Sequence, residues 1–258
     1  EVFGALGFLS QLNLSKSFED NEFHYLKPKL LVRYAPGSMR KELEGSRLDP
    51  ITAFNLNRLD NINNYEAGIT GTYGLDYKIK KDDTDVMSLS LAQIINEKEN
   101  KKMSSKSSMD EKLSDLVGSA NYRLNEQLKL NYNFAIDQNY NQINYNEIGT
   151  EFNFNPIKID FNFIEESKHI GNQKYFKTNF EISKNENGLF SFSTKRNLLT
   201  DSSEYYNLSY EYINDCLRAG LVYRREFYED SELDAENSLM FKITLSPIGD
   251  IESPSFNR

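Results

Sequence analysis

The chain has 258 residues, a formal net charge of −9 and a mean hydropathy of −0.64. The acidic balance excludes a nucleic-acid partner, because phosphate binding needs concentrated Lys and Arg and the basic residues here are scattered singly. The longest apolar run, residues 2–9, is far shorter than the ~20 residues that a helix needs to cross a bilayer. The chain begins at Glu1 without an initiating Met or a targeting signal, so we expect it to be the C-terminal part of a longer protein.

Apolar residues occupy every second position in segments that run along the whole chain. A period of two predicts strands with one apolar and one polar face. We count about thirteen such segments, most of them about ten residues long. A short turn of helix is expected only within residues 51–59. In chain order, the alternating apolar positions include Leu30, Val32, Tyr34, Ile69, Tyr73, Leu75, Tyr77, Ile79, Leu128, Leu130, Tyr132, Phe134, Ile136, Ile157, Ile159, Phe161, Phe163, Phe176, Thr178, Phe180, Ile182, Tyr206, Leu208, Tyr210 and Tyr212.

Short and long connections alternate between these segments. The expected short connections are residues 19–22, 81–84, 125–126, 155–156, 185–187 and 214–215. The expected long ones are residues 37–64, 96–113, 138–144, 165–173, 199–203 and 229–235. Outer-membrane barrels have this asymmetry, with tight periplasmic turns and longer extracellular loops.

Two architectures fit the alternation, a soluble β sandwich and a transmembrane β barrel. Strands of a sandwich average about five or six residues, whereas a tilted strand needs about nine to eleven to cross hydrocarbon. Segment length and the alternating connections favour the barrel. We therefore predict an all-β fold, an antiparallel up-and-down transmembrane β-barrel segment. Its apolar face contacts lipid, and polar residues such as Lys129, Asn131 and Asn162 face the lumen.

Cys216 is the only cysteine and directly precedes the strand predicted over residues 217–228. If the last strand, residues 237–245, ends at the periplasm, Cys216 lies at the periplasmic edge, in an oxidising space. A lone cysteine there suggests a disulfide partner in a part of the protein outside this chain. A buried, unpaired cysteine that packs as a small hydrophobe is the alternative.

Four segments carry a resemblance to a known family. They are "LKPKLLVRYAPGSMR", "LDPITAFNLNRLDNINNYEAGITGTYGLDYKI", "DCLRAGLVYRREFYED" and "SLMFKITLSPIG". They resemble LptD, the outer-membrane lipopolysaccharide-assembly family, from about Leu26 to Gly249. The resemblance implies that residues 1–258 are the second half of one barrel domain. A periplasmic jelly roll and the first barrel half would precede it.

The function implied by the resemblance is lipopolysaccharide translocation into the outer leaflet of the Gram-negative outer membrane. The saccharide would pass the lumen, and the molecule would leave through a lateral seam between the first and last strands. The implied partners are lipopolysaccharide, membrane lipids, a lipoprotein plug, a periplasmic bridge protein and the barrel-assembly machinery. Cys216 would bond to the N-terminal domain, although many relatives have two adjacent cysteines and here Leu217 follows.

The candidate site residues fall into two further groups. The strand predicted to form one side of the seam contains Asn237, Leu239, Phe241, Ile243 and Leu245, and Pro247 would end its pairing because it lacks an N–H. The longest loop carries basic side chains that we expect to contact lipid A phosphates, with ordinary solvation as the alternative. These residues are Arg40, Lys41, Arg47 and Arg58.

Neither a catalytic constellation nor a cofactor site is expected. His24 and His169 are isolated in the sequence, without acidic neighbours at a metal-ligand spacing. The acidic run at residues 80–85 lacks the spaced oxygen ligands of a calcium loop and predicts a polar turn. The alternative functions are a passive or substrate-specific outer-membrane channel and a soluble all-β binding module.

Overall fold

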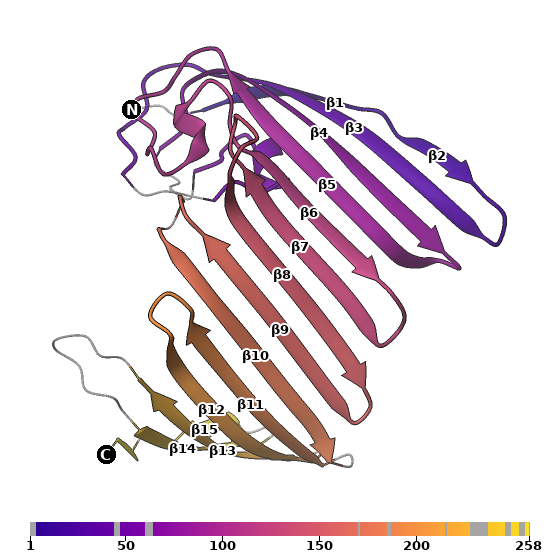
Figure 1. The fold of residues 1–258 in the computed structure, drawn as a ribbon, viewed down its shortest axis with the longest axis vertical. Coiled ribbons are helices and arrows are strands. Elements are labelled where there is room, and N and C mark those ends of the chain that lie inside the picture. The colour runs from indigo at the N-terminus through magenta and orange to yellow at the C-terminus, as the bar shows by residue number, and fades with distance from the viewer. Residues whose placement is uncertain are drawn as a thin grey trace. The chain divides into compact units, whose positions relative to one another are not determined.

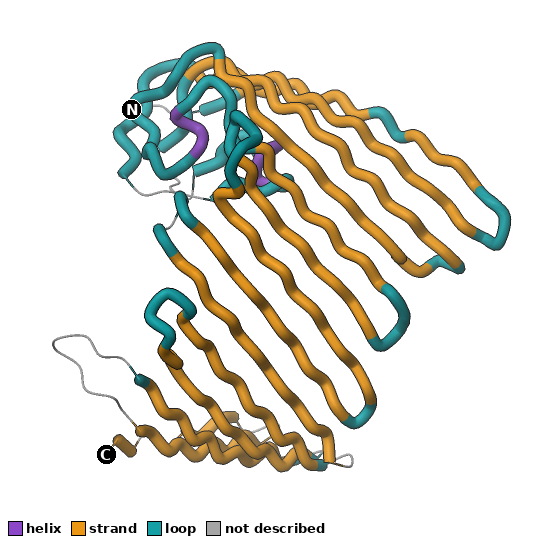
Figure 2. The backbone as a smooth tube through the Cα atoms, viewed as in Figure 1, coloured by secondary structure: helices purple, strands orange, loops and turns teal. Residues whose placement is uncertain are grey.

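The computed structural model consists almost entirely of strands and their connections (Figures 1 and 2). It describes residues 4–43, 47–59, 64–169, 171–184, 187–214, 216–227, 237–245, 249–252 and 256–257. The first strands are β1 (Leu6–Gln11), β2 (Leu14–Ser17), β3 (Glu22–Ala35), β4 (Gly68–Lys81), β5 (Thr84–Asn96), β6 (Leu116–Arg123), β7 (Leu128–Ile136) and β8 (Ile143–Phe154). The remaining ones are β9 (Ile157–Glu166), β10 (Gln173–Lys184), β11 (Gly188–Asn197), β12 (Ser202–Ile213), β13 (Leu217–Glu226), β14 (Asn237–Leu245), β15 (Gly249–Glu252) and β16 (Phe256–Asn257).

Two short 3₁₀ helices, η1 (Thr52–Phe54) and η2 (Ser108–Asp110), interrupt the connections. The first lies inside the range where the sequence predicts a helical turn. Neither helix is long or apolar enough to cross a bilayer in the described part of the chain.

The strands follow one another along the sheet in chain order, which is the up-and-down topology that the alternation predicts. The ladders between the described strands are antiparallel; for example, β3 pairs with β4 over the whole length of both strands. Both β1 and β2 pair with β3, and both β15 and β16 pair with β14. The chain forms two compact units. Unit 1 consists of residues 1–124, 130–148 and 165–173, and unit 2 of the remaining residues.

Tight turns join the strands at one end, as expected from the sequence. Asp82 and Asp83 connect β4 to β5 with φ values of 47° and 60°, and Asp20 and Asn21 precede β3 with φ values of 61° and 54°. Asp and Asn accept this left-handed conformation more readily than most residues do. In unit 1, the long connections gather at the opposite ends of the strands, together with η1 and η2 (Figure 1).

The two faces of the sheet differ sharply in chemistry. In unit 2, register partners on consecutive strands form an apolar row, Phe180, Phe192, Leu208, Tyr223 and Leu239. The next residue along each ladder lies on the opposite face and forms a polar row, Asn179, Ser193, Asn207, Arg224 and Ser238. We call these the apolar face and the polar face. Many large side chains of the apolar face are exposed in the chain alone.

Unit 1 has the same two faces. Leu30, Val32 and Tyr34 of β3 are about half exposed and belong to the apolar face. Lys29 and Arg33 lie on the polar face, where the Lys29 Nζ atom is 2.9 Å from an Asp76 carboxylate oxygen. Along β3, the side chains of the polar face become more buried toward the loop end, and Arg33 is completely buried. Those of the apolar face remain exposed.

One expectation needs correction. The sequence predicts that residues 237–245 form the last strand, but β15 and β16 pair with the other edge of β14, through four and two residue pairs. These two segments are short and lack an alternating apolar pattern, so periodicity did not reveal them. On β12, Tyr206, Tyr210 and Tyr212 lie on the apolar face. Tyr205 instead follows a register irregularity and pairs with Lys195 on the polar face.

Candidate functional site

The loop between β3 and β4 folds back onto the polar face of unit 1. Its η1 segment places the Phe54 ring over Gly74 of β4, where a Cβ atom would lie 2.9 Å from that ring. Leu56 packs over Gly7 of β1 in the same way, with a corresponding distance of 2.5 Å. The Lys29 ammonium lies 4.3 Å from the Phe54 ring centroid. Glycines in these strands thus provide the space that the loop occupies. We call residues 47–59 the inward loop.

Buried polar contacts fix the inward loop to the sheet. Arg33 Nε donates to the carbonyl oxygen of Leu56 at 2.7 Å, and Thr72 Oγ1 donates to that of Ala53 at 3.1 Å. Arg58 Nη2 donates to Thr70 Oγ1 at 2.5 Å. Since these groups are shielded from water, losing one contact would leave a buried donor unsatisfied, which costs about 1–3 kcal/mol.

Two arginines share one buried carboxylate beneath the loop. Glu66 Oε2 lies 3.5 Å from Arg58 Nη1 and 4.0 Å from Arg33 Nη1. Burial lowers the pKa of Arg58, while Glu66 acts in the opposite direction. The cluster carries a local excess of positive charge, and its guanidinium groups are enclosed by protein.

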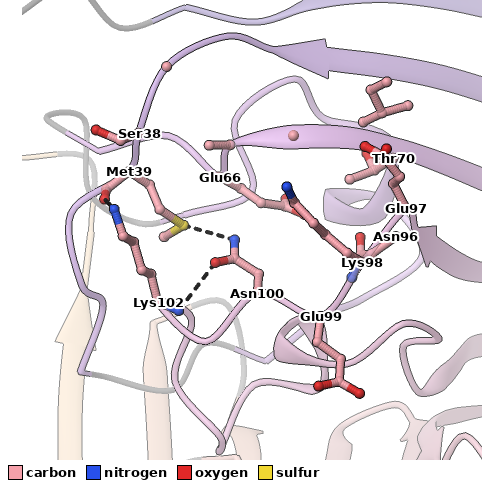
Figure 3. Close-up of a pocket in the computed structure, with 14 residues that line it drawn as sticks. Ser38, Met39, Glu66, Thr70, Asn96, Glu97, Lys98, Glu99, Asn100 and Lys102 are labelled. Atoms are coloured by element: carbon pink, nitrogen blue, oxygen red, sulfur yellow. Dashed lines mark hydrogen bonds between the residues drawn. The ribbon is translucent and has the colours of Figure 1, made fainter.

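The connection between β5 and β6 meets the loop that precedes the inward loop (Figure 3). Lys102 Nζ donates to the carbonyl oxygen of Met39 at 2.9 Å, and the backbone N–H of Glu42 donates to that of Lys102 at 2.8 Å. Asn100 Nδ2 lies 3.0 Å from the Met39 sulfur. These loops and the first residues of β4 line a cavity of about 280 Å³.

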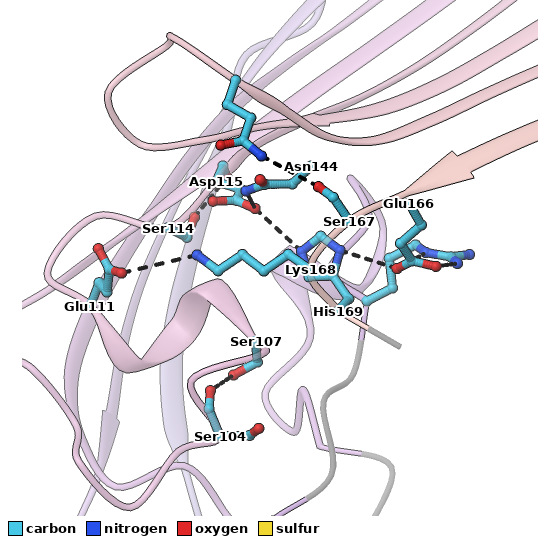
Figure 4. Close-up of polar contacts among 12 residues, drawn as sticks. Ser104, Ser107, Glu111, Ser114, Asp115, Asn144, Glu166, Ser167, Lys168 and His169 are labelled. Atoms are coloured by element: carbon cyan, nitrogen blue, oxygen red, sulfur yellow. Dashed lines mark hydrogen bonds and ion pairs between the residues drawn. The ribbon is translucent and has the colours of Figure 1, made fainter. Parts of the chain in front are cut away.

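A chain of charged and polar side chains links three connections and the adjoining ends of β8 and β9 (Figure 4). Arg47, in the inward loop, places Nη2 2.6 Å from Glu166 Oε2. Glu166 Oε1 lies 3.3 Å from His169 Nδ1, and His169 Nε2 lies 3.2 Å from Asp115 Oδ2. Asn144 Nδ2 donates to the same Asp115 oxygen at 2.8 Å. We call these five residues the charged network.

Burial makes the charged network strong and sensitive to protonation. Glu166, His169 and Asp115 have side chains that are at most 1% exposed. Burial disfavours the charged form of His169, but hydrogen bonds from its ring to Asp115 and Glu166 raise its pKa above the usual value. Burial likewise opposes the charge of Arg47, yet its bonds to Glu166 raise the Arg47 pKa. When the His169 imidazole is protonated, the positive charges of Arg47 and His169 balance the negative charges of Asp115 and Glu166.

The structure separates the four basic residues of the long loop. Arg58 is buried, and Arg47 is bound to Glu166 while its guanidinium lies 3.8 Å from the Tyr145 ring centroid. Arg40 and Lys41 are exposed. Of the four, Arg40 and Lys41 are therefore the two whose side chains lie at the surface.

Cys216 is exposed and has a free thiol in this chain, and its backbone N–H donates to Asn214 Oδ1 at 3.0 Å. The predicted seam residues Asn237, Leu239, Phe241, Ile243 and Leu245 lie in β14. Pro247 lies outside the described residues, as does the predicted connection at residues 229–235.

Sequence reasoning missed the charged network and treated His169 as isolated. Bonded members of the network are separated by up to 119 residues, so no local spacing signals their contact. His24, the other histidine, lies near the turn ends of β3 and β4, where Nε2 is 2.6 Å from Glu22 Oε1 and Nδ1 is 2.7 Å from the Tyr77 hydroxyl. Among the described residues, no group of three or more His, Cys, Asp or Glu side chains could hold a metal ion.

Residues 3–188 match the family model of LptD, described as LPS transport system D. The chain belongs to the LptD family. This chain is thus an outer-membrane protein of lipopolysaccharide transport. The matched residues include β1–β10, the inward loop and the charged network, and they end before Cys216 and β14. No curated protein sequence matches the chain significantly.

Several solved porin structures are similar to this chain. One is a triple mutant of the Rhodopseudomonas blastica porin, with 10% sequence identity, a TM-score of 0.41, and coverage of 99% of this chain and 97% of that chain. Another mutant of the same porin has 9% identity and a TM-score of 0.41, and covers 97% of this chain and 92% of that chain.

Proposed function

We propose that this chain is the C-terminal part of a barrel that carries lipopolysaccharide to the outer leaflet, with the saccharide moving along the polar face. The observation that carries the proposal is the pair of rows on unit 2, one apolar and one polar, on neighbouring residues of five consecutive strands. A lipopolysaccharide molecule has the same division between acyl chains and saccharide. The polar face supplies hydrogen-bonding partners that hydrocarbon cannot supply.

The inward loop is the element that we propose to control passage at the loop ends of the strands. Longer connections of outer-membrane barrels are extracellular, so this end would face the cell exterior. The charged network holds Arg47 of the inward loop against the end of β9. Opening for a saccharide would require these contacts to separate. We propose that Arg40 and Lys41, which are exposed, contact phosphates outside the enclosed part of the loop.

The lateral seam is proposed on the C-terminal side of the sheet. The strand β14 has nine paired residues with β13, but only four with β15 and two with β16. Fewer ladder hydrogen bonds oppose separation on the side of β15 and β16, and each bond lost in lipid is costly. We propose that the seam forms on this side, against the first strand of the complete barrel. A lipoprotein plug, a periplasmic bridge protein and the barrel-assembly machinery are the proposed partners.

Depletion of the full-length protein separates transport from passive diffusion. If the protein translocates lipopolysaccharide, depletion should stop newly made lipopolysaccharide from reaching an outer-leaflet antibody. Uptake of small hydrophilic solutes should not fall. Normal surface delivery accompanied by reduced solute uptake would instead support the channel function.

A photo-crosslinking amino acid tests the route along the polar face. It replaces Asn179 in one variant and the adjacent Phe180, on the apolar face, in the matched control. Saccharide adducts at position 179 should form only while new lipopolysaccharide is delivered. Adducts at position 180 should persist when delivery stops, because that side contacts the membrane continuously. If adduct formation depends on delivery at neither position 179 nor position 180, the proposed route is contradicted.

A further inference from the structure

A second, larger cavity lies beneath the inward loop, on the polar face of unit 1. Its volume is about 530 Å³, within the range of about 300–1,000 Å³ that is usual for small-molecule sites. Residues 47–51 of the loop form one side, and the strands β5, β6, β7 and β8 form the other. Loop and sheet thus define a single recess.

The walls of this recess combine hydroxyl, amide and carboxylate groups with aromatic rings. Ser90 and Ser119 are register partners on β5 and β6. Asn133 Nδ2 donates to Glu147 Oε2 at 2.9 Å, and the Tyr145 hydroxyl donates to the same oxygen at 2.5 Å. Such groups offer donors and acceptors within a short distance of each other. A sugar ring presents the complementary pattern, with hydroxyls around its rim and C–H groups on its faces.

The charges of the recess oppose an anionic ligand. Asp49 and Glu147 contribute carboxylates, whereas Arg47 is the one basic residue among the lining residues. Its guanidinium is already held by Glu166 and stacked on the Tyr145 ring. One basic and two acidic residues leave the lining with a net negative charge, which would repel a phosphate. Uncharged saccharide hydroxyls do not incur this repulsion.

We propose that this cavity binds a neutral sugar unit of the core saccharide, and that Asn133, Glu147 and Ser119 are its hydrogen-bonding residues. The inference rests on the proposed transport function and assigns one saccharide-binding site along the transport route. Because residues 47–51 form one side of the cavity, the bound sugar contacts the inward loop directly. Phosphate groups of the same molecule would lie elsewhere.

The test is equilibrium binding of dephosphorylated core oligosaccharide to the full-length protein in detergent. Binding is monitored by saturation-transfer NMR. Asn133→Leu removes hydrogen-bonding groups and should weaken binding about tenfold. Ser119→Phe fills the cavity without altering Asn133 and should weaken binding by a similar factor. Asn131→Leu is the control, because Asn131 is on the same strand and face but outside the cavity lining. It should leave the affinity unchanged.

Three results would overturn the saccharide site. They are absence of binding to the unmodified protein, equal affinity in all variants, and displacement of the oligosaccharide by inorganic phosphate. Heat-modifiable gel mobility identifies a variant that fails to fold, and the second cavity variant then decides the outcome. Because binding is measured without transport, normal surface delivery with no oligosaccharide binding refutes this site alone. Failure of the depletion experiment refutes the transport function itself.

Discussion

Arg47 and Glu166 are 119 residues apart in the chain, yet Arg47 Nη2 lies 2.6 Å from Glu166 Oε2. The contact joins the inward loop to the end of β9, and the Glu166 carboxylate is completely buried. The Arg47 side chain is 29% exposed. The pair holds the inward loop against the sheet. Removing Arg47 would therefore leave the negative charge of the buried Glu166 carboxylate less well compensated.

Arg47→Met should lower the free energy of unfolding by about 3 kcal/mol, because one partner of a buried ion pair is lost. It should also expose the inward loop, so that trypsin cleaves after Arg58 faster than in the unmodified protein. Urea unfolding and timed proteolysis in detergent measure the two effects. Arg196→Met is the control, since it breaks an exposed pair with Asp201 and should cost under about 1 kcal/mol. Equal effects of both variants would contradict a special role for Arg47.

The pH dependence of stability should show the contribution of His169. Its pKa is raised in the folded protein by Asp115 and Glu166, so its stabilising effect is present below the usual value of 6.5. That effect is lost as the pH rises through the raised pKa. His169→Gln should therefore be less stable than the unmodified protein at about pH 5.5, and the difference should shrink as the medium becomes alkaline.

Unfolding curves of both proteins across this pH range provide the measurement. Asp110 and Glu111 also have pKa values raised by burial, but both proteins retain them, so the difference isolates His169. A difference that grows with pH would show that the imidazole is neutral in the charged network.

Gly74 is predicted to be necessary for the inward loop. A Cβ atom there would lie 2.9 Å from the Phe54 ring and would also clash with the carbonyl oxygen of Leu91. Gly74→Ala should cost about 1–3 kcal/mol, as overpacking does, and should displace η1. Gly71→Ala is the matched control on the same strand, because its Cβ would meet nothing within 4 Å.

Uptake of a large antibiotic is the cellular measurement for this pair. If the inward loop closes the polar passage, cells with Gly74→Ala should take up more of the antibiotic, and cells with Gly71→Ala should not. Unchanged uptake in a folded Gly74→Ala variant would mean that the loop does not restrict passage.

Cys216 is predicted to form a disulfide with a part of the protein outside this chain. Its exposure fits a bond to another segment. Cys216→Ser in the full-length protein should abolish a long-range crosslink, seen as a mobility difference between reducing and non-reducing gels. If the mobility difference persists in Cys216→Ser, the disulfide uses other cysteines.

Sequence periodicity predicted the strands, their faces and the order of short and long connections. The signal is local, because a strand repeats its apolar residue every second position and a tight turn needs residues such as Asp82 and Asp83. The charged network has no such signal. Arg47, Asp115 and His169 come together only because three connections meet at one end of unit 1. The short strands β15 and β16 were missed for a related reason, since four and two residues are too few to show a period.

The last prediction tests which face contacts lipid. Leu208 and Asn207 are adjacent on β12 but lie on opposite faces, paired with Tyr223 and Arg224 of β13. Leu208→Lys would place a charge in hydrocarbon, at a cost of about 2–4 kcal/mol near the bilayer centre. Asn207→Lys would place the same charge on the polar face, where water or a carboxylate can compensate it. The folded fraction in outer-membrane extracts, measured by heat-modifiable mobility, should fall for Leu208→Lys and remain normal for Asn207→Lys. The opposite ranking would mean that the apolar face packs against protein, and the proposed saccharide route would have to be abandoned.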